Sequence, residues 1–175
     1  MAGATIWLTG LPASGKTTLV NAVATELAIA GRPAQVVDGD ALRIGLTSDL
    51  GFSKEDRAES VRRAGEVALI LAQAGVVALV SLVSPYREHR DSVRRRHAGS
   101  GVAFVEVHVA TPLEVCEQRD PKGLYAKARR GDLTGMTGVD DPYEPPLHAE
   151  IVTGGEEASP SFNVSQVLRA LESTI

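Results

Sequence analysis

The sequence predicts an α/β fold, in which helices flank a parallel sheet. Short apolar runs alternate along the chain with longer segments of helical periodicity, and parallel strands need such crossover connections. The run GVVALVSLVS at residues 75–84 is apolar almost throughout, which is typical of a strand covered on both faces. Both observations favour a sheet that is wrapped by helices.

The N-terminal part of the chain is expected to supply two strands and one helix. Residues 4–9 (ATIWLT) have the pattern of a short strand bounded by Gly10, and residues 16–30 show helical periodicity that ends before Gly31. A second apolar run, PAQVVD, follows at residues 33–38. The alternation therefore begins as strand, glycine loop, helix and strand.

The remaining elements continue this alternation. Helices are expected at about 54–74 and 86–97, on either side of the apolar run already described. The run VAFVEVHVA at residues 102–110 is the fourth and last strand that we predict, and the tail from Pro160 predicts a closing helix. The sheet is thus expected to have four strands.

A basic lid is expected over residues of about 120–146. This stretch is rich in basic residues, glycines and prolines, and it has little apolar periodicity. Long irregular segments within a compact domain are typical of functional loops. We therefore expect it to be a loop that covers a site.

Length and composition indicate a single domain over residues 1–175, with 43% hydrophobic residues to build its core. A net charge of -4 argues against binding to nucleic acid or to anionic lipid through overall charge. No window approaches the roughly 20 apolar residues that span a bilayer, so no membrane partner is expected. Cys116 is the single cysteine and is expected to be a buried thiol, which suits a cytoplasmic protein.

Residues 10–17 read GLPASGKT and satisfy the motif G-x-x-x-x-G-K-[ST] at every fixed position. Its glycines turn the backbone so that N–H groups point at phosphate oxygens, and the helix that follows adds its positive dipole end. Lys16 is expected to contact the β and γ phosphates of ATP, and the Thr17 hydroxyl to bind Mg²⁺. The strand before the motif and the helix after it predict a P-loop NTPase fold. The predicted nucleotide-binding residues of this segment are Gly10, Leu11, Pro12, Ala13, Ser14, Gly15, Lys16, Thr17 and Thr18.

A P-loop serves GTPases, motor ATPases and kinases alike, so a second signal is needed. The guanine-reading motif N/T-K-x-D is missing, and the D-x-x-G of residues 132–135 lies in the polar lid, far from any predicted strand. A basic lid suits a small-molecule kinase, because its closure excludes water from the phosphates. We therefore predict a small P-loop kinase.

Five further segments carry a more specific signal. They are DGDALR at 38–43, LGFSKEDR at 50–57, SPYR at 84–87, RDPKGLY at 119–125 and DPYEP at 141–145. In this order they resemble the adenylylsulfate kinase family, and the resemblance runs from about residue 4 to residue 146. It implies an enzyme that transfers the γ-phosphoryl group of ATP to the 3′-hydroxyl of adenylylsulfate with Mg²⁺, and it implies a homodimer.

The resemblance assigns the acceptor chemistry to polar side chains near the second strand. Asp40 would take the proton of the acceptor hydroxyl, although an aspartate here also suits helix N-capping. Asp38 is available for that cap, or for support of the metal. Arg43 and Arg57 would hold the phosphosulfate and ribose side, because guanidinium groups suit oxyanions. Without the resemblance, Arg57 would be taken for an exposed residue at the start of a helix.

The resemblance also assigns residues to the purine and to the pocket wall. Phe52 would stack on the adenine of the acceptor, although a core position also fits a phenylalanine beside a loop glycine. Lys122 would reach the acceptor and Arg119 would flank the ATP adenine; otherwise both are solvated lid charges. Val83 and Ser84 would line the acceptor pocket. We expect no phosphoenzyme at Ser84, because no base is evident beside it.

Two positions depart from the pattern of the family, and both lie on the acceptor side. Ser60 stands where the family usually has asparagine, and it offers a shorter side chain with fewer hydrogen bonds. In the lid, residues 135–138 read Gly-Met-Thr-Gly where the family usually has Gly-Phe-Thr-Gly. Met136 therefore stands where the family has the second aromatic residue against the adenine, and its flexible thioether side chain fixes the plane of that ring less well than an aromatic side chain does. Gly135, which precedes it, is also expected to line the acceptor site.

Two rival functions remain open at this point. One is a related P-loop kinase that acts on a different nucleotide-like acceptor, and the other is a nucleotide-binding regulatory protein without turnover. The basic run of residues 94–97 is expected to be a solvated helix end rather than a nucleic-acid contact. The four histidines show no metal-ligand spacing, so Mg²⁺ is the one metal expected.

Overall fold

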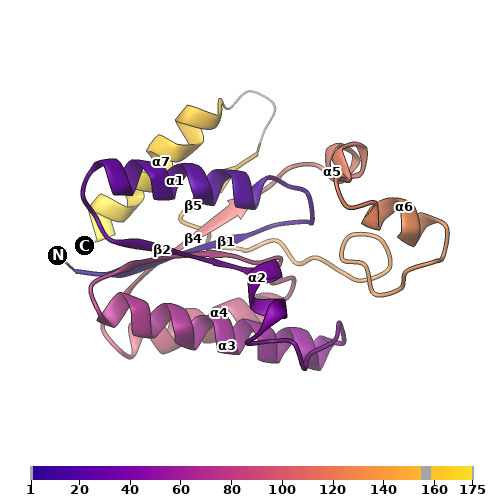
Figure 1. The fold of residues 1–175 in the computed structure, drawn as a ribbon, viewed down its shortest axis with the longest axis horizontal. Helices are drawn as coiled ribbons and strands as arrows, with labels where there is room; N and C mark the ends of the chain where they lie inside the picture. Colours follow the sequence, from indigo (N-terminus) through magenta and orange to yellow (C-terminus); the bar gives the residue numbers. More distant parts are fainter. Residues whose placement is uncertain (1, 155–158, 175) are drawn as a thin grey trace.

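The computed structural model describes residues 2–154 and 159–174, which form a five-stranded parallel sheet with helices on both faces (Figure 1). The strands are β1 (Ala4–Thr9), β2 (Ala34–Asp38), β3 (Val77–Ser81), β4 (Ala103–Val109) and β5 (Ile151–Thr153). The helices are α1 (Lys16–Ile29), α2 (Gly39–Ile44), α3 (Lys54–Gln73), α4 (Arg87–Ala98), α5 (Leu113–Arg119), α6 (Leu124–Arg129) and α7 (Pro160–Thr174). The predicted α/β fold is confirmed. None of these helices is long and apolar enough to cross a membrane.

The strand order is β2-β3-β1-β4-β5, and each neighbouring pair is parallel. In the centre, Ile6 of β1 lies opposite Leu79 of β3 and Val105 of β4. Helices α1 and α7 cover one face of the sheet, and α3 and α4 cover the other (Figure 1). Because the strands are parallel, their carboxyl ends meet at one edge, which is where ligands bind in open α/β sheets.

The alternation of side chains along β1 divides the core into two parts. Ile6 and Leu8 belong to an apolar cluster with Val20 of α1 and Val167 of α7. Trp7 points to the opposite face and belongs to the cluster with Val61 of α3. Since both faces of the strand meet apolar neighbours, β1 shows no polar alternation. This explains why its sequence is hydrophobic at successive positions.

The structure corrects three expectations about the elements. The fourth strand is not the last, because β5 pairs with β4 at the edge of the sheet and is only three residues long. The lid is not wholly irregular, because it contains α6, which buries Tyr125. The third strand ends at Ser81, before the end of the apolar run, and the chain then leaves the sheet through Ser84, whose φ is +40°.

The basic run at the end of α4 is solvated only in part, because Arg95 and Arg96 are exposed whereas the other two residues contact the sheet. His97 is fully buried, with Nε2 2.9 Å from the Thr5 hydroxyl, and burial lowers its pKa. Arg94 forms ion pairs with Glu106 and Glu150. His97 and Arg94 therefore join α4 to the sheet, and the helical pattern alone did not reveal these two contacts.

Candidate functional site

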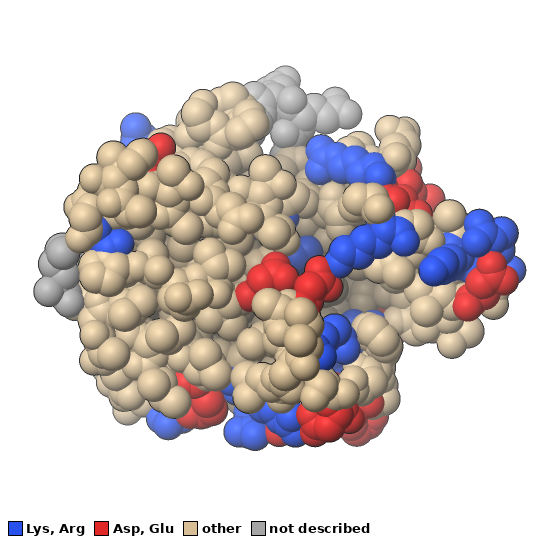
Figure 2. All heavy atoms as spheres, viewed as in Figure 1, with Lys and Arg blue, Asp and Glu red and all other residues tan. Residues whose placement is uncertain are grey.

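A cavity of about 970 Å³ opens at the carboxyl edge of the sheet. Figure 2 shows a hollow between the body of the molecule and the projecting segment of α5 and α6, with acidic and basic side chains meeting at its mouth. Nearly all the predicted site residues line this cavity: Pro12, Ala13, Ser14, Gly15, Lys16, Thr17, Thr18, Asp40, Arg43, Phe52, Arg57, Ser60, Val83, Ser84, Arg119, Lys122, Gly135 and Met136. Segments that are far apart in the sequence thus share one space.

The loop of residues 10–17 has the backbone geometry that its glycines predict. Gly10 has φ +155°, and a Cβ there would lie 2.5 Å from the carbonyl oxygen of Val109. Gly15 has φ +102° and caps α1 without any side-chain hydrogen bond to the first turn. The first N–H groups of α1 therefore have no side-chain cap, and together with the positive dipole end of the helix they suit an anion bound at the loop.

Lys16 is held inside this loop. Its Nζ donates to the carbonyl oxygens of Gly10 at 2.9 Å and Leu11 at 2.7 Å, and to the Ser14 hydroxyl at 3.3 Å. Gly10 and Leu11 do not line the cavity themselves; they contribute through these carbonyl groups. Burial lowers the pKa of Lys16 to about 8. The ammonium group is thus fixed beneath the anion site.

Oxygen ligands collect beside the loop. The Thr17 hydroxyl donates to Asp38 Oδ2 at 3.2 Å and lies 3.5 Å from the Ser81 hydroxyl. The other oxygen of Asp38, Oδ1, accepts from the backbone N–H of Asp40 at 3.0 Å and caps α2. Asp38 is therefore the N-cap, which leaves the Asp40 carboxylate free for another role. Hydroxyl and carboxylate oxygens suit Mg²⁺.

Asp40 meets the lid at the mouth of the cavity. Its carboxylate forms an ion pair with Lys122. Both side chains are more than half exposed, at 70% for Asp40 and 57% for Lys122. Such an exposed pair is worth about 0–1 kcal/mol, so an entering ligand can displace it. Lys122 is thus a lid residue that already reaches the candidate base.

Phe52 lies between two arginines. Its ring is 57% exposed, which excludes a core position, and the Cζ atoms of Arg43 and Arg57 lie 4.2 Å and 5.6 Å from its centroid. Arg57 is not solvated, because it donates to the carbonyl oxygen of Gly135 at 2.7 Å and lies 3.4 Å from an Asp141 oxygen. Burial and then the charge of Arg57 lower the pKa of Arg43. Two guanidinium groups, one of them paired with Asp141, therefore lie beside an exposed aromatic ring in the cavity.

The two departures from the family pattern are both buried. Ser60 is 9% exposed, and Met136 is 5% exposed in a cluster with Cys116 and Tyr125. The backbone N–H of Met136 donates to Asp140 at 2.7 Å, which fixes this turn of the lid. Met136 therefore lines the cavity from a packed position. This packing was not visible in the sequence.

Ser84 forms part of the wall and does not resemble a nucleophile. Its hydroxyl accepts a hydrogen bond of 3.1 Å from Trp7 Nε1, a group that cannot act as a base. Beside it, the carbonyl oxygen of Val83 accepts from Thr9 at 2.8 Å. The positive φ of Ser84 is rare for a residue with a side chain, so its neighbours must hold it in place.

Arg119 lies next to the loop of residues 10–17. Its Nη1 is 3.5 Å from the carbonyl oxygens of Ala13 and Ser14. This position agrees with its predicted place on the nucleotide side of the cavity. The geometry therefore separates a phosphate end, built on the loop, from an end that contains Asp40 and the two arginines.

Comparison with known proteins gives the family. The sequence profile described as Adenylylsulphate kinase matches residues 2–154. The chain belongs to the adenylylsulphate kinase family. Adenylyl-sulfate kinase of Rippkaea orientalis is 51% identical over 170 residues, which cover 97% of this chain and 92% of that protein.

Solved structures of family members agree with the fold. The structure of the Mycobacterium tuberculosis APS kinase in complex with AMPPNP and APS matches with a TM-score of 0.94 and 46% identity over 98% of both chains. A hexameric APS kinase from Thiobacillus denitrificans matches with a TM-score of 0.74 and 33% identity, over 98% of this chain and 29% of that one. The P-loop kinase fold is therefore confirmed.

The family resemblance did not point to one wall of the cavity. Thr153 ends β5 and Gly154 follows it, and Pro160, Asn163 and Val164 belong to the first turns of α7; all five line the cavity. The available signal was a short apolar run ending in glycine, but three strand residues are too few to establish periodicity. None of these five residues was predicted from the sequence to belong to the adenylylsulphate kinase site.

Proposed function

We propose that this chain is an adenylylsulfate kinase, which transfers the γ-phosphoryl group of ATP to the 3′-hydroxyl of adenylylsulfate and releases ADP. The observation that carries the proposal is the single cavity that joins a P-loop to Asp40, Arg43, Phe52 and Arg57. The Mycobacterium relative binds AMPPNP, an ATP analogue, together with APS, which is adenylylsulfate. We infer the same pair of sites in this chain.

The residues divide the reaction between them. The amides of the loop and Lys16 hold the β and γ phosphates and stabilise the charge of the transferring group. Asp40 accepts the proton of the attacking hydroxyl, because its carboxylate is exposed at the opposite end of the cavity and is not used as a helix cap. Lys122 would leave Asp40 for an anionic group of the acceptor. Arg43 and Arg57 would bind the phosphosulfate side.

Mg²⁺ belongs to this proposal. The Thr17 hydroxyl and Asp38 carboxylate would hold it beside the phosphates, and their two oxygens are 3.2 Å apart. Mg²⁺ is usually bound by one or two carboxylates together with substrate phosphates, so this small set of ligands fits. When bound, the ion neutralises charge on the β and γ oxygens.

The remaining expectations are also proposals. We propose one kinase domain over residues 1–175, with its lid at about 120–146, acting in the cytoplasm as a homodimer. The hexameric Thiobacillus relative supports self-association, but not a dimer in particular. Light scattering of the purified protein gives the number of subunits. A mass other than twice that of the chain contradicts the dimer.

One acceptor assay tests the proposed function. The protein is incubated with γ-labelled ATP and adenylylsulfate, AMP, adenosine or no acceptor, and the label is followed by chromatography. We expect label in 3′-phosphoadenylylsulfate and little elsewhere. Transfer to a different nucleotide supports the related kinase, and ATP binding without transfer supports the regulatory protein. Either result contradicts the proposed substrate.

A further inference from the structure

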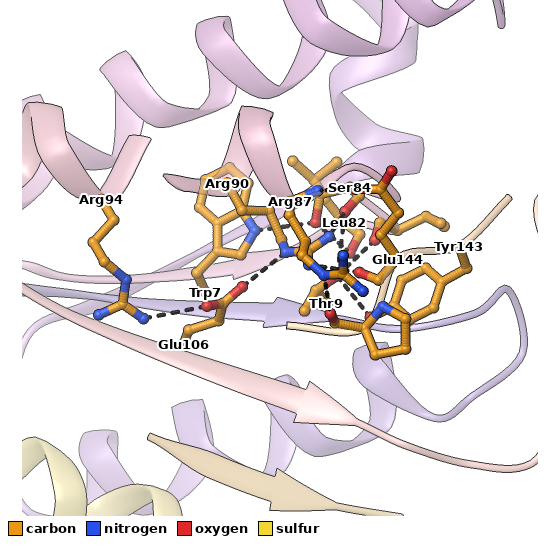
Figure 3. Close-up of polar contacts among 12 residues, drawn as sticks. Trp7, Thr9, Leu82, Ser84, Arg87, Arg90, Arg94, Glu106, Tyr143 and Glu144 are labelled. Atoms are coloured by element: carbon orange, nitrogen blue, oxygen red, sulfur yellow. Dashed lines mark hydrogen bonds and ion pairs between the residues drawn. The ribbon is translucent and has the colours of Figure 1, made fainter. Parts of the chain in front are cut away.

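A fully buried arginine lies behind the acceptor wall. Arg90 of α4 is 1% exposed, does not line the cavity, and lies beyond the residues that bind either substrate. Figure 3 shows it between Glu106 on one side and Ser84 and Glu144 on the other. Burying a guanidinium group is costly unless every part of it is paired, so its partners indicate its role.

Each nitrogen of this guanidinium group contacts a different segment. Nε donates to Glu106 Oε1 of β4 at 2.8 Å, Nη1 to the carbonyl oxygen of Ser84 at 2.6 Å, and Nη2 to the carbonyl oxygen of Glu144 at 2.6 Å. The rigid planar group therefore fixes three segments relative to one another. One of them is the central sheet, which serves as the reference.

The other two segments belong to the acceptor half of the site. Ser84 lines the cavity with φ +40°, a conformation that persists only when its surroundings hold it. Glu144 lies at the C-terminal end of the lid, where its backbone N–H donates to the carbonyl oxygen of Pro85 at 2.8 Å and its carboxylate accepts from the backbone N–H of Arg87 at 2.9 Å. The wall and the base of the lid are thus joined at Arg90.

We propose that Arg90 is a positioning residue for acceptor binding, which acts by fixing the wall at Ser84 and the base of the lid at Glu144. This rests on the proposed function for the identity of the acceptor. Arg90 donates no hydrogen bond to residues 10–17, whose carbonyl groups accept instead from Lys16, Tyr125 and Thr111. Loss of Arg90 should therefore weaken the binding of the acceptor and leave the binding of ATP nearly unchanged.

The variants must separate positioning from the cost of an unpaired buried charge. Arg90→Met alone removes one ion-pair partner from the buried Glu106 carboxylate, and this loss is costly in itself. The main variant therefore combines Arg90→Met with Glu106→Gln. Arg90→Lys is the second variant, because it keeps a charge for Glu106 but cannot reach two carbonyl groups with a planar fork. Arg94→Met is the matched control: Arg94 pairs with the same Glu106 from the same helix but does not contact Ser84 or Glu144.

Steady-state kinetics give the main readout. For the double variant and for Arg90→Lys, we expect kcat/KM for adenylylsulfate to fall about 10- to 100-fold, because small displacements of a binding wall have effects of this size. The KM for ATP should change less than twofold. Arg94→Met should keep both values. Equal losses for the two substrates, or an unchanged acceptor kcat/KM in a folded variant, would overturn the proposal.

Hydrogen exchange of the free protein tests the same idea without turnover. The backbone N–H of Glu144 should exchange faster in both Arg90 variants, whereas amides of residues 10–17 should keep their rates. This result does not depend on the acceptor, so it separates a failure of the positioning role from a failure of the named substrate. Unchanged exchange at Glu144 contradicts the positioning role even if adenylylsulfate is the substrate.

Discussion

The two ends of the cavity are built in different ways. The phosphate end is one uninterrupted stretch, residues 10–17, whose backbone forms the site around a lysine that is 8% exposed. The acceptor end uses side chains from α2, the start of α3 and the lid, and its base Asp40 is 70% exposed. The first is formed by local geometry, whereas the second depends on contacts between distant segments.

This difference determines what a substitution should do. Changing the charge at the phosphate end removes an interaction with the transferring group, so turnover should fall most. Changing a contact at the acceptor end alters how well one substrate is held, so KM should respond.

Loss of Lys16 should have the largest effect. We expect Lys16→Ala to lower kcat by about 10³-fold or more, because the charge acts on the transferring phosphoryl group. The melting temperature should not fall, since burial opposes the charge of this lysine. A coupled assay for ADP and a thermal melt measure both quantities. Lys127→Ala, at an exposed position of α6, is the control. Near wild-type turnover in Lys16→Ala contradicts the phosphate cradle.

Loss of the carboxylate at Asp40 comes next. Asp40→Asn should lower kcat by about 10²–10⁴, the usual contribution of a general base. The variant also loses the ion pair with Lys122, but that exposed pair contributes little to stability. Single-turnover kinetics separate the chemical step from product release. Asp132→Asn, an exposed lid variant, should remain active. A fully active Asp40→Asn enzyme would show that Asp40 is not the general base and serves only as the ion-pair partner of Lys122 in the lid.

The effect of pH on the affinity for ATP should be smaller than the effect of either of these substitutions on kcat. Lys16 has a pKa of about 8, so at pH 9 about one tenth of the free protein carries the charge, and affinity should fall up to about tenfold from pH 7. Calorimetric titration with an ATP analogue measures this affinity, and in Lys16→Ala the affinity should lack this fall between pH 7 and pH 9.

In the unfolded chain the lysine stays protonated to its usual pKa of 10.5. The unfolded state therefore binds more protons between pH 8 and 10.5, and Lys16 adds stability as pH rises through that window.

Restoring the family residues at the acceptor end should give the smallest change. Ser60→Asn with Met136→Phe should lower the KM for adenylylsulfate about 2- to 10-fold with little change in kcat, through one hydrogen bond and one aromatic contact. Because Met136 is packed against Cys116 and Tyr125, the larger ring should also lower the melting temperature. The KM for ATP is the internal control. A raised acceptor KM contradicts the aromatic wall that we infer at position 136.

The same contrast explains what could be predicted from the sequence. The P-loop was predicted in full because its chemistry depends on consecutive residues, and the four longer strands were predicted because buried strands are apolar throughout. The short strand β5 was missed because pairing with β4, rather than its own pattern, defines it. The partners of Arg90 were missed because two of its contacts go to carbonyl groups, which every residue carries. No pattern of residue types distinguishes them.

The ion pair between Asp40 and Lys122 has a consequence for competition at the mouth of the cavity. In the free protein the Lys122 ammonium group is paired with the Asp40 carboxylate, which an acceptor hydroxyl must reach. Lys122 therefore competes with the acceptor for Asp40. At about 0–1 kcal/mol, such an exposed pair can weaken acceptor binding by no more than about fivefold. Salt screens the pair, with a Debye length of about 8 Å at physiological ionic strength. Moderate salt therefore removes part of this competition before it begins to weaken the arginine contacts deeper in the cavity.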